Sequence, residues 1–356
     1  MKKILVLSVY PLGTTAGIRY RVEQYRDCFM QAGYKLEFLP FFTRNAYLSY
    51  RKGGVFKKGL QILWGMAKRI GLLVRPPRHE VLWLYRASTP TALTVFERYV
   101  TWRCKSRQVY EFDDAIWLKG PGIGALRHRL TTGSRVTKSC KKANAVIVGN
   151  QYLADYASAL NASTTVIPTT VEVHHRFLPG IETREPTIVW TGSFSTLEYL
   201  ERLLPVLEKV IERTGAKLKV ISDVFPESAE LDFECIPWSE ATEHVALRGA
   251  WVGVMPLDDN AWTKGKCGFK AIQYMASGVV PVVSDVGANR DIVEDGVTGF
   301  LCATETEWEE KLIQVIENEG VRAEMSAKAR DVAVRRYSSV VQCALLRHAV
   351  TGKTES

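Results

Sequence analysis

Short apolar runs recur along this chain, and segments with helical periodicity separate them. The apolar runs are Ile4–Tyr10, Leu36–Phe41, Val81–Tyr85, Arg107–Phe112, Ala145–Val148, Thr187–Thr191, Leu218–Ser222, Trp251–Met255 and Val279–Ser284. Strand, turn, helix and strand in this order form parallel βαβ units. The alternation predicts an α/β protein with two doubly wound sheets in series, joined between Pro168 and Pro186.

The length of the chain, 356 residues, exceeds what one hydrophobic core usually supports. We therefore expect two domains, residues 1–170 and residues 183–335. Doubly wound sheets bind their ligands beyond the carboxyl ends of the strands. A site is expected where the loops after Ile4–Tyr10, Arg107–Phe112, Thr187–Thr191 and Trp251–Met255 come together.

The seven cysteines are scattered and none is spaced as C-x-x-C. This pattern predicts neither a disulfide framework nor a zinc site, and it favours a reducing compartment. The apolar stretch near the N-terminus is too short for a signal peptide, and no apolar run reaches the ~18 residues of a membrane span. A cytoplasmic protein is expected, with peripheral membrane contact left open.

Basic residues gather in the first half. Residues 51–150 contain 20 Lys and Arg against 5 Asp and Glu, which favours an anionic partner such as lipid headgroups or a phosphorylated acceptor. Residues 55–75 predict an amphipathic helix with Lys57, Lys58, Lys68, Arg69 and Arg75 on one arc and aliphatic side chains on the other, with Trp64 at the border. The helix is either interfacial, with cations on headgroups, or packed with its apolar arc in the core. A nucleic-acid partner is not expected, since the positive charge is the only feature that would support one.

The stretch Lys264–Leu301, KGKCGFKAIQYMASGVVPVVSDVGANRDIVEDGVTGFL, carries the strongest motif. A helix expected over Lys266–Ala276 places Lys266, Lys270 and Gln273 on one face. Gly268 allows close approach of the backbone, and Lys264 adds charge at a helix start that suits phosphate.

This stretch resembles the donor-binding segment of glycosyltransferase family four, in Gly268, Met275–Gly278, Pro281–Val283 and Asp295–Leu301. Ala143–Gly149, Val166–Val171, Gly192 and Tyr337–Ser338 extend the resemblance over the chain. It implies the GT-B fold, two Rossmann-like domains facing each other across a cleft, with acceptor on the first and nucleotide sugar on the second. Residues 336–356 would form a helix that returns to the first domain.

The resemblance implies a retaining, metal-independent glycosyltransferase whose donor is a nucleoside diphosphate sugar and whose acceptor is a lipid-linked or cell-envelope saccharide. Two family glutamates are replaced here by Lys266 and Gln273, so Lys266 is assigned to donor phosphate or an acidic sugar. A non-catalytic sugar-nucleotide or glycan-binding protein and a sugar-nucleotide epimerase remain alternatives.

Other residues are assigned by their place beside strands. Asp113 follows the strand Arg107–Phe112 and is expected to act in catalysis, with Asp114 either beside it or capping a helix. Donor contacts are expected from Gly17, Arg19, Gly192, Ser193, Trp238 and Phe269, with Arg21 as a further phosphate clamp. Both arginines have surface ion pairs as the alternative, and Trp238 has burial in the core. His174 and His175 are expected to bind no metal.

Overall fold

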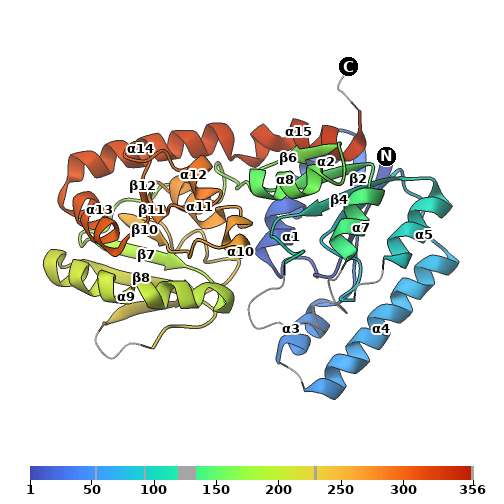
Figure 1. Ribbon diagram of the computed structural model, residues 1–356, viewed down its shortest axis with the longest axis horizontal. Coiled ribbons are helices and arrows are strands. Elements are labelled where there is room, and N and C mark those ends of the chain that lie inside the picture. The colour runs from blue at the N-terminus through green and yellow to red at the C-terminus, as the bar shows by residue number, and fades with distance from the viewer. Residues whose placement is uncertain (53, 92–93, 119–133, 228–230, 354–356) are drawn as a thin grey trace. The chain divides into compact units, whose positions relative to one another are not determined.

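The computed structural model describes residues 1–52, 54–91, 94–118, 134–227 and 231–353. It divides into two compact units, one of Met1–Thr169 with Gln342–Ser356 and one of Thr170–Val341. Each unit contains a six-stranded sheet whose neighbouring strands are all parallel (Figure 1). The expected α/β class with two doubly wound sheets is confirmed.

The first unit has strand order β2-β1-β3-β4-β5-β6. Its strands are β1 (Lys2–Ser8), β2 (Tyr34–Pro40), β3 (Val81–Tyr85), β4 (Arg107–Phe112), β5 (Ala145–Val148) and β6 (Thr164–Val166). Its helices are α1 (Ala16–Arg21), the 3₁₀ turn η1 (Glu23–Tyr25), α2 (Arg26–Gln31), α3 (Arg44–Lys52), α4 (Val55–Val74), α5 (Val95–Cys104), α7 (Arg135–Lys142) and α8 (Gln151–Ser158). The strand order reverses between β1 and β3, so the switch point of this sheet lies at the carboxyl ends of these two strands.

The second unit has strand order β12-β11-β10-β7-β8-β9, with its switch point between β7 and β10. Its strands are β7 (Thr187–Thr191), β8 (Lys217–Ser222), β9 (Phe233–Pro237), β10 (Val252–Met255), β11 (Val280–Ser284) and β12 (Phe300–Cys302). Its helices are α9 (Phe194–Thr214), α10 (Ala261–Lys264), α11 (Phe269–Ala276), α12 (Asn289–Ile292), α13 (Glu305–Glu317) and α14 (Glu319–Arg336).

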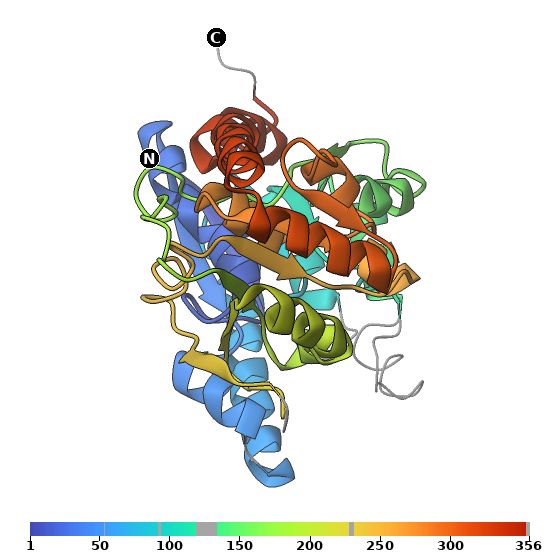
Figure 2. The same ribbon diagram turned by 90° about the vertical axis from the view of Figure 1, so that its left-hand side faces the viewer.

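Helices cover both faces of the second sheet. Val252 and Val254 share a buried cluster with residues of α9 and α13, and α9 can be followed in yellow-green in Figure 2. Gly253 lies between these valines and faces the ring of Tyr274 on α11, which a Cβ would approach to 2.5 Å. Because successive strand residues point to opposite faces, α11 covers the face that α9 and α13 leave open.

The last helix, α15 (Ser339–Thr351), begins in the second unit and ends in the first. Leu346, Ala349 and Val350 join the buried cluster of the first sheet. A disulfide links Cys343 of this helix to Cys28 of α2, a pair that the cysteine spacing, which predicts no disulfide framework, does not indicate. The two cysteines are separated by 315 positions in the sequence. The spacing of cysteines along the chain cannot predict a pair so far apart.

Two helical segments are shorter than a continuous helix would be. Residues 16–31 form α1, a 3₁₀ turn and α2 in succession. The helix expected from Lys266 begins only at Phe269, because Gly268 has a left-handed backbone with φ of 61°. Glycine suits this position because a side chain is strained at this positive φ, and a Cβ would also displace the end of the Ile292 side chain, 2.1 Å away. Among the described residues, no helix combines the length and the apolar character needed to cross a membrane.

Candidate functional site

A cluster of charged side chains lies at the carboxyl edge of the first sheet, near its switch point. Arg86 follows β3 and pairs with both carboxylates that follow β4. Its Nε donates to Asp113 Oδ1 at 2.6 Å, and its Nη2 donates to Asp114. Arg86 has a left-handed backbone with φ of 58°, uncommon for a residue with a side chain. Backbone strain of this kind persists where the surroundings fix it, which occurs often at functional sites.

Asp113 is held as an anion. Burial alone would raise its pKa, but the charge and hydrogen bond of Arg86, the charge of Arg21 and the Tyr85 hydroxyl lower the pKa below its ordinary value. Tyr85 Oη donates to both carboxylate oxygens, at 2.9 and 3.0 Å. Gly17 leaves room for this contact, because a Cβ there would lie 2.0 Å from Tyr85 Oη. Tyr85 therefore occupies the space beside Gly17, where a donor contact was expected.

Arg21 and Arg19 are buried, which contradicts the surface ion pairs considered for them. Arg21 Nε donates to Glu111 Oε1 at 2.6 Å, and Nη1 donates to the carbonyl of Ile167 at 2.6 Å. Glu111 also accepts from Trp83 Nε1 at 2.7 Å. The guanidinium of Arg19 lies 4.9 Å from the centre of the Tyr20 ring. Arg21 is thus committed to a buried ion pair beneath the Asp113 cluster and is not a phosphate clamp.

Arg86 was missed in the sequence. It stands directly after the fully buried run Val81–Tyr85, and a charged residue immediately after a buried strand is the signal that could have identified it. Asp114 pairs with Arg86 and lies in a bend. The structure thus favours the ion pair over the helix cap for Asp114.

In the second unit the candidate site lies between the end of β7 and the start of α11. Gly192 follows β7, and a Cβ there would lie 2.2 Å from the ring of Trp190 and 2.8 Å from Thr196 Oγ1. Ser193 is the N-cap of α9, and its backbone N–H donates to Thr196 Oγ1 at 3.3 Å. Gly192 therefore allows the first turn of α9 to pack closely on Trp190 at the switch point.

Lys270 on α11 faces this first turn of α9. Its Nζ donates to Thr196 Oγ1 at 3.1 Å and lies 4.5 Å from the centre of the Trp190 ring. Within the described part of the chain, it has no carboxylate partner. Burial and the charge of Lys266 hold its pKa well below the ordinary value. A partly buried cation beside the amino end of a 21-residue helix is an arrangement that favours an anion.

The expected face of Lys266, Lys270 and Gln273 does not form. Lys266 precedes α11 and lies in the turn before Gly268, so the i, i+4, i+7 relation of a helix does not apply to it. Gln273 is 4% exposed. Lys270 is the member of the three that faces the start of α9.

The other predicted donor residues lie around the same edge. Lys264 ends α10 and pairs with Asp259 at 2.9 Å. Trp238 follows β9, is neither fully buried nor exposed, and donates its indole N–H to Glu243 at 3.2 Å. Phe269 is the first residue of α11. His174 and His175 are both exposed, and among the described residues no group of three His, Cys, Asp or Glu side chains is placed to hold a metal.

The helix expected over residues 55–75 is α4. Its apolar arc is not packed in the core, and the interfacial interpretation needs correction at Arg69. Arg69 is 2% exposed and donates to the carbonyl oxygens of Ser8, Leu39 and Ser88. The assignment of Arg69 to headgroups is wrong, because it anchors the helix inside its own unit. The apolar arc is not core either, since Leu63, Trp64 and Ile70 are at least half exposed.

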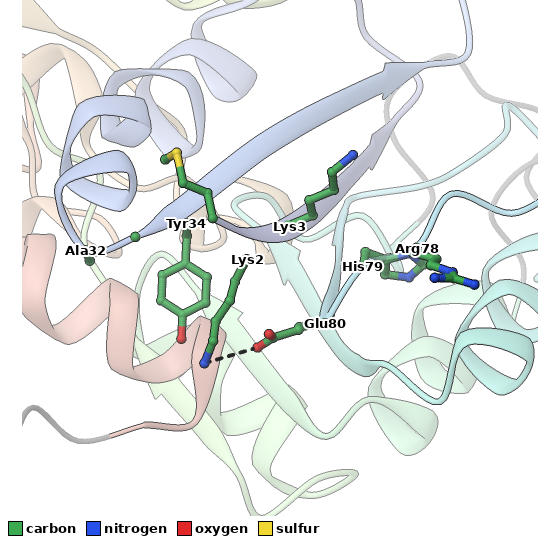
Figure 3. Close-up of a pocket in the computed structure, with 9 residues that line it drawn as sticks. Lys2, Lys3, Ala32, Tyr34, Arg78, His79 and Glu80 are labelled. Carbon is green, nitrogen blue, oxygen red and sulfur yellow. Dashed lines mark ion pairs between the residues drawn. The ribbon is translucent and has the colours of Figure 1, made fainter.

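A separate pocket lies at the opposite, amino edge of the first sheet (Figure 3). Lys2, Tyr34 and Glu80 line it, and Lys2 Nζ lies 3.7 Å from Glu80 Oε2. Parallel sheets bind their ligands at the carboxyl ends of the strands, so this pocket is not the candidate site.

Residues 185–318 match the family model described as glycosyl transferases group 1. The second unit is a group 1 glycosyltransferase domain. No curated protein sequence matches the chain at a significant level. The match covers the switch point described above, with Gly192, Lys270 and the start of α11.

Solved structures similar to the whole chain have the GT-B fold of glycosyltransferases. Sucrose-phosphate synthase from Thermosynechococcus elongatus superposes with a TM-score of 0.71 at 12% identity, over 98% of each chain. Anabaena HepE in complex with UDP and glucose gives 0.67 at 13% identity, over 99% of this chain and 100% of that one. The lipopolysaccharide outer core galactosyltransferase WaaB gives 0.62 at 12% identity, over 99% of each. The chain therefore has the GT-B fold.

Proposed function

We propose that this glycosyltransferase moves a sugar from a nucleoside diphosphate sugar to a hydroxyl group of a saccharide. The observation that carries the proposal is Lys270, a cation with no carboxylate partner in the described part of the chain, at the switch point of the group 1 domain. Its Nζ lies 3.1 Å from Thr196 in the first turn of α9. A diphosphate seated there is neutralised by Lys270 and by the backbone N–H groups that begin α9.

The reaction breaks the bond between the anomeric carbon and the diphosphate oxygen, and the electron pair leaves with the diphosphate. The acceptor hydroxyl oxygen bonds to the anomeric carbon, and its proton passes to an oxygen of the departing diphosphate. Lys270 stabilises the charge that grows on the leaving group, and Lys266 and Lys264 add to the positive field. We propose retention of configuration at the anomeric carbon and no obligatory metal.

On the first unit, we propose that Asp113 contacts hydroxyls of the sugar or the acceptor. It stays ionised because Arg86 lowers its pKa, and its charge favours the positive character of the anomeric carbon in the transition state. Tyr85 and Arg86 fix the direction of the carboxylate. Gly17 leaves room for Tyr85 in this arrangement. We propose Arg19, on the same helix, as a donor contact.

For the base and ribose of the donor we propose Trp238, Phe269 and Gln273, with Gly192 and Ser193 beside the phosphates. Uracil nucleotides are the first to test, because the HepE structure and a Staphylococcus aureus TarM structure each contain UDP. For the acceptor we propose a lipid-linked or cell-envelope saccharide at the inner face of the membrane. The excess of cations in residues 51–150 supports an acceptor carrying phosphate.

The test is a thermal shift screen of the chain against nucleoside diphosphates and their sugars, followed by product analysis with the donor that binds. We expect stabilisation by one nucleotide class and release of its diphosphate. Tight binding without release identifies a binding protein, and an isomerised donor without release identifies an epimerase. Either outcome contradicts transfer.

A further inference from the structure

Helix α4 carries a continuous apolar stripe on its outer side. Its large apolar side chains that are at least half exposed are Phe56, Leu60, Leu63, Trp64, Ile70 and Val74. Positions 56, 60, 63, 67, 70 and 74 recur at intervals of three or four residues, so they lie along one side of the helix. Ala67 fills the remaining position and is also exposed.

The opposite side of α4 is fixed to the first unit. A Cβ on Gly65 would lie 2.3 Å from the Phe41 ring, so the helix backbone rests directly on that ring. Arg69 donates to the carbonyls of Ser8 and Leu39, at 3.1 and 2.8 Å, and to that of Ser88 at 2.9 Å. Rotating the stripe inward would turn Arg69 out to solvent and leave these carbonyls without their donor, so the stripe remains outside.

Cations border the stripe on one side. At ~100° per residue, Lys57, Lys68 and Arg75 lie within about 20° of one another and next to Trp64. Lys68 Nζ lies 4.2 Å from the centre of the Trp64 ring. An anionic surface that meets the stripe also pairs with this row of cations.

We propose that α4 is a membrane-docking surface for a bilayer containing anionic lipid. The stripe enters the boundary between headgroups and acyl chains, and Lys57, Lys68 and Arg75 contact the phosphates. Contiguous apolar patches of this kind on soluble proteins mark interaction sites. The helix lies flat on the surface, and α3 and α5 pack beside it (Figure 1).

The anchor of α4 connects this surface to the candidate site. Arg69 binds the carbonyls of Ser8, at the end of β1, and of Ser88, two residues after Arg86. The docked helix thus holds the carboxyl edge of the first sheet near the membrane surface, where a lipid-linked acceptor has its saccharide. This consequence rests on the proposed function, but the docking itself does not.

The experiment is flotation of the full chain with vesicles of phosphatidylcholine alone and of equal parts phosphatidylcholine and phosphatidylglycerol. We expect binding to the mixed vesicles, and weakening by more than about tenfold in the variant Leu63→Glu with Val74→Glu, which loses two inserted side chains. The matched control is Ile181→Glu with Val340→Glu, which changes two exposed aliphatic residues of the second unit by the same charge. This control is expected to bind as the unchanged protein does.

Equal flotation of the α4 variant and the unchanged protein overturns the proposal, as does failure of the unchanged protein to bind mixed vesicles. A dimer in light scattering that the α4 variant dissociates, without vesicle binding, shows that a second copy covers the stripe. The flotation assay contains no sugar donor, so a negative result in it does not bear on the proposed sugar transfer. Failure of transfer likewise leaves the docking result valid.

Discussion

Replacing Lys270 by methionine removes the charge that we assign to the donor diphosphate while keeping an apolar chain of similar length over Trp190. In the free protein, burial and Lys266 hold the pKa of Lys270 well below its ordinary value. A bound diphosphate raises this pKa, because the anion favours the charged amine. Hydrogen bonds to charged groups contribute about 1.5–3 kcal/mol. Since each 1.4 kcal/mol is tenfold in affinity, Lys270→Met is expected to weaken donor binding about 10- to 100-fold.

Proton uptake gives a second readout of the same contact. Between the lowered pKa of the free protein and the higher pKa of the complex, Lys270 is partly neutral before binding and charged afterwards. Donor binding in that pH range is therefore expected to take up as much as about one proton. Titration calorimetry in buffers of different ionisation enthalpy measures this uptake.

The matched control is Lys311→Met. Lys311 Nζ lies 4.8 Å from the centre of the Phe300 ring in the same unit, so it resembles Lys270 in its aromatic contact but lies outside the candidate site. The control is expected to keep both affinity and proton uptake. Unchanged affinity and uptake in Lys270→Met would refute the assignment of Lys270 to the diphosphate.

Three further changes test other parts of the site. Asp113→Asn is expected to lower kcat about 100-fold with donor affinity within about threefold, because the lost charge acts mainly in the transition state; an unchanged kcat in steady-state kinetics removes Asp113 from the reaction. Lys266→Ala is expected to weaken donor binding about tenfold by calorimetry, since one cation leaves the phosphate region; unchanged affinity would exclude that role. Arg69→Met is expected to lower the free energy of unfolding by about 2–4 kcal/mol in urea denaturation, because three buried carbonyls lose a charged donor; an unchanged midpoint contradicts the anchor.

Several sheet strands were predictable because they are short, largely buried and mostly apolar runs, whereas the three-residue β6 and β12 and the more exposed β9 were not predicted. Val81–Tyr85, Arg107–Phe112, Ala145–Val148 and Thr187–Thr191 have the bounds that the sequence predicts. The position of Asp113 at a strand end follows from the same pattern. Its partner Arg86 does not, because the pairing depends on a left-handed residue and on neighbours from a different strand.

Periodicity also predicted α4 but not the side on which it packs. Helical spacing separates an arc with cations from an apolar arc, and it carries no information about which arc meets the unit. Gly65 and Arg69 decide this through contacts with Phe41 and with three backbone carbonyls, which only the three-dimensional structure reveals. The start of α11 was misplaced for a similar reason, because the left-handed backbone of Gly268 ends the preceding turn.

The central claim is that the group 1 domain binds a donor diphosphate through Lys270 and releases it after sugar transfer. The most direct measurement is the rate of nucleoside diphosphate release from the donor found by thermal shift, with acceptor present, for the unchanged protein, Lys270→Met and Lys311→Met. We predict release by the unchanged protein and by Lys311→Met at similar rates, and at least about tenfold slower release by Lys270→Met. Equal rates for all three variants, or no release by the unchanged protein from any donor that it binds, would contradict the claim.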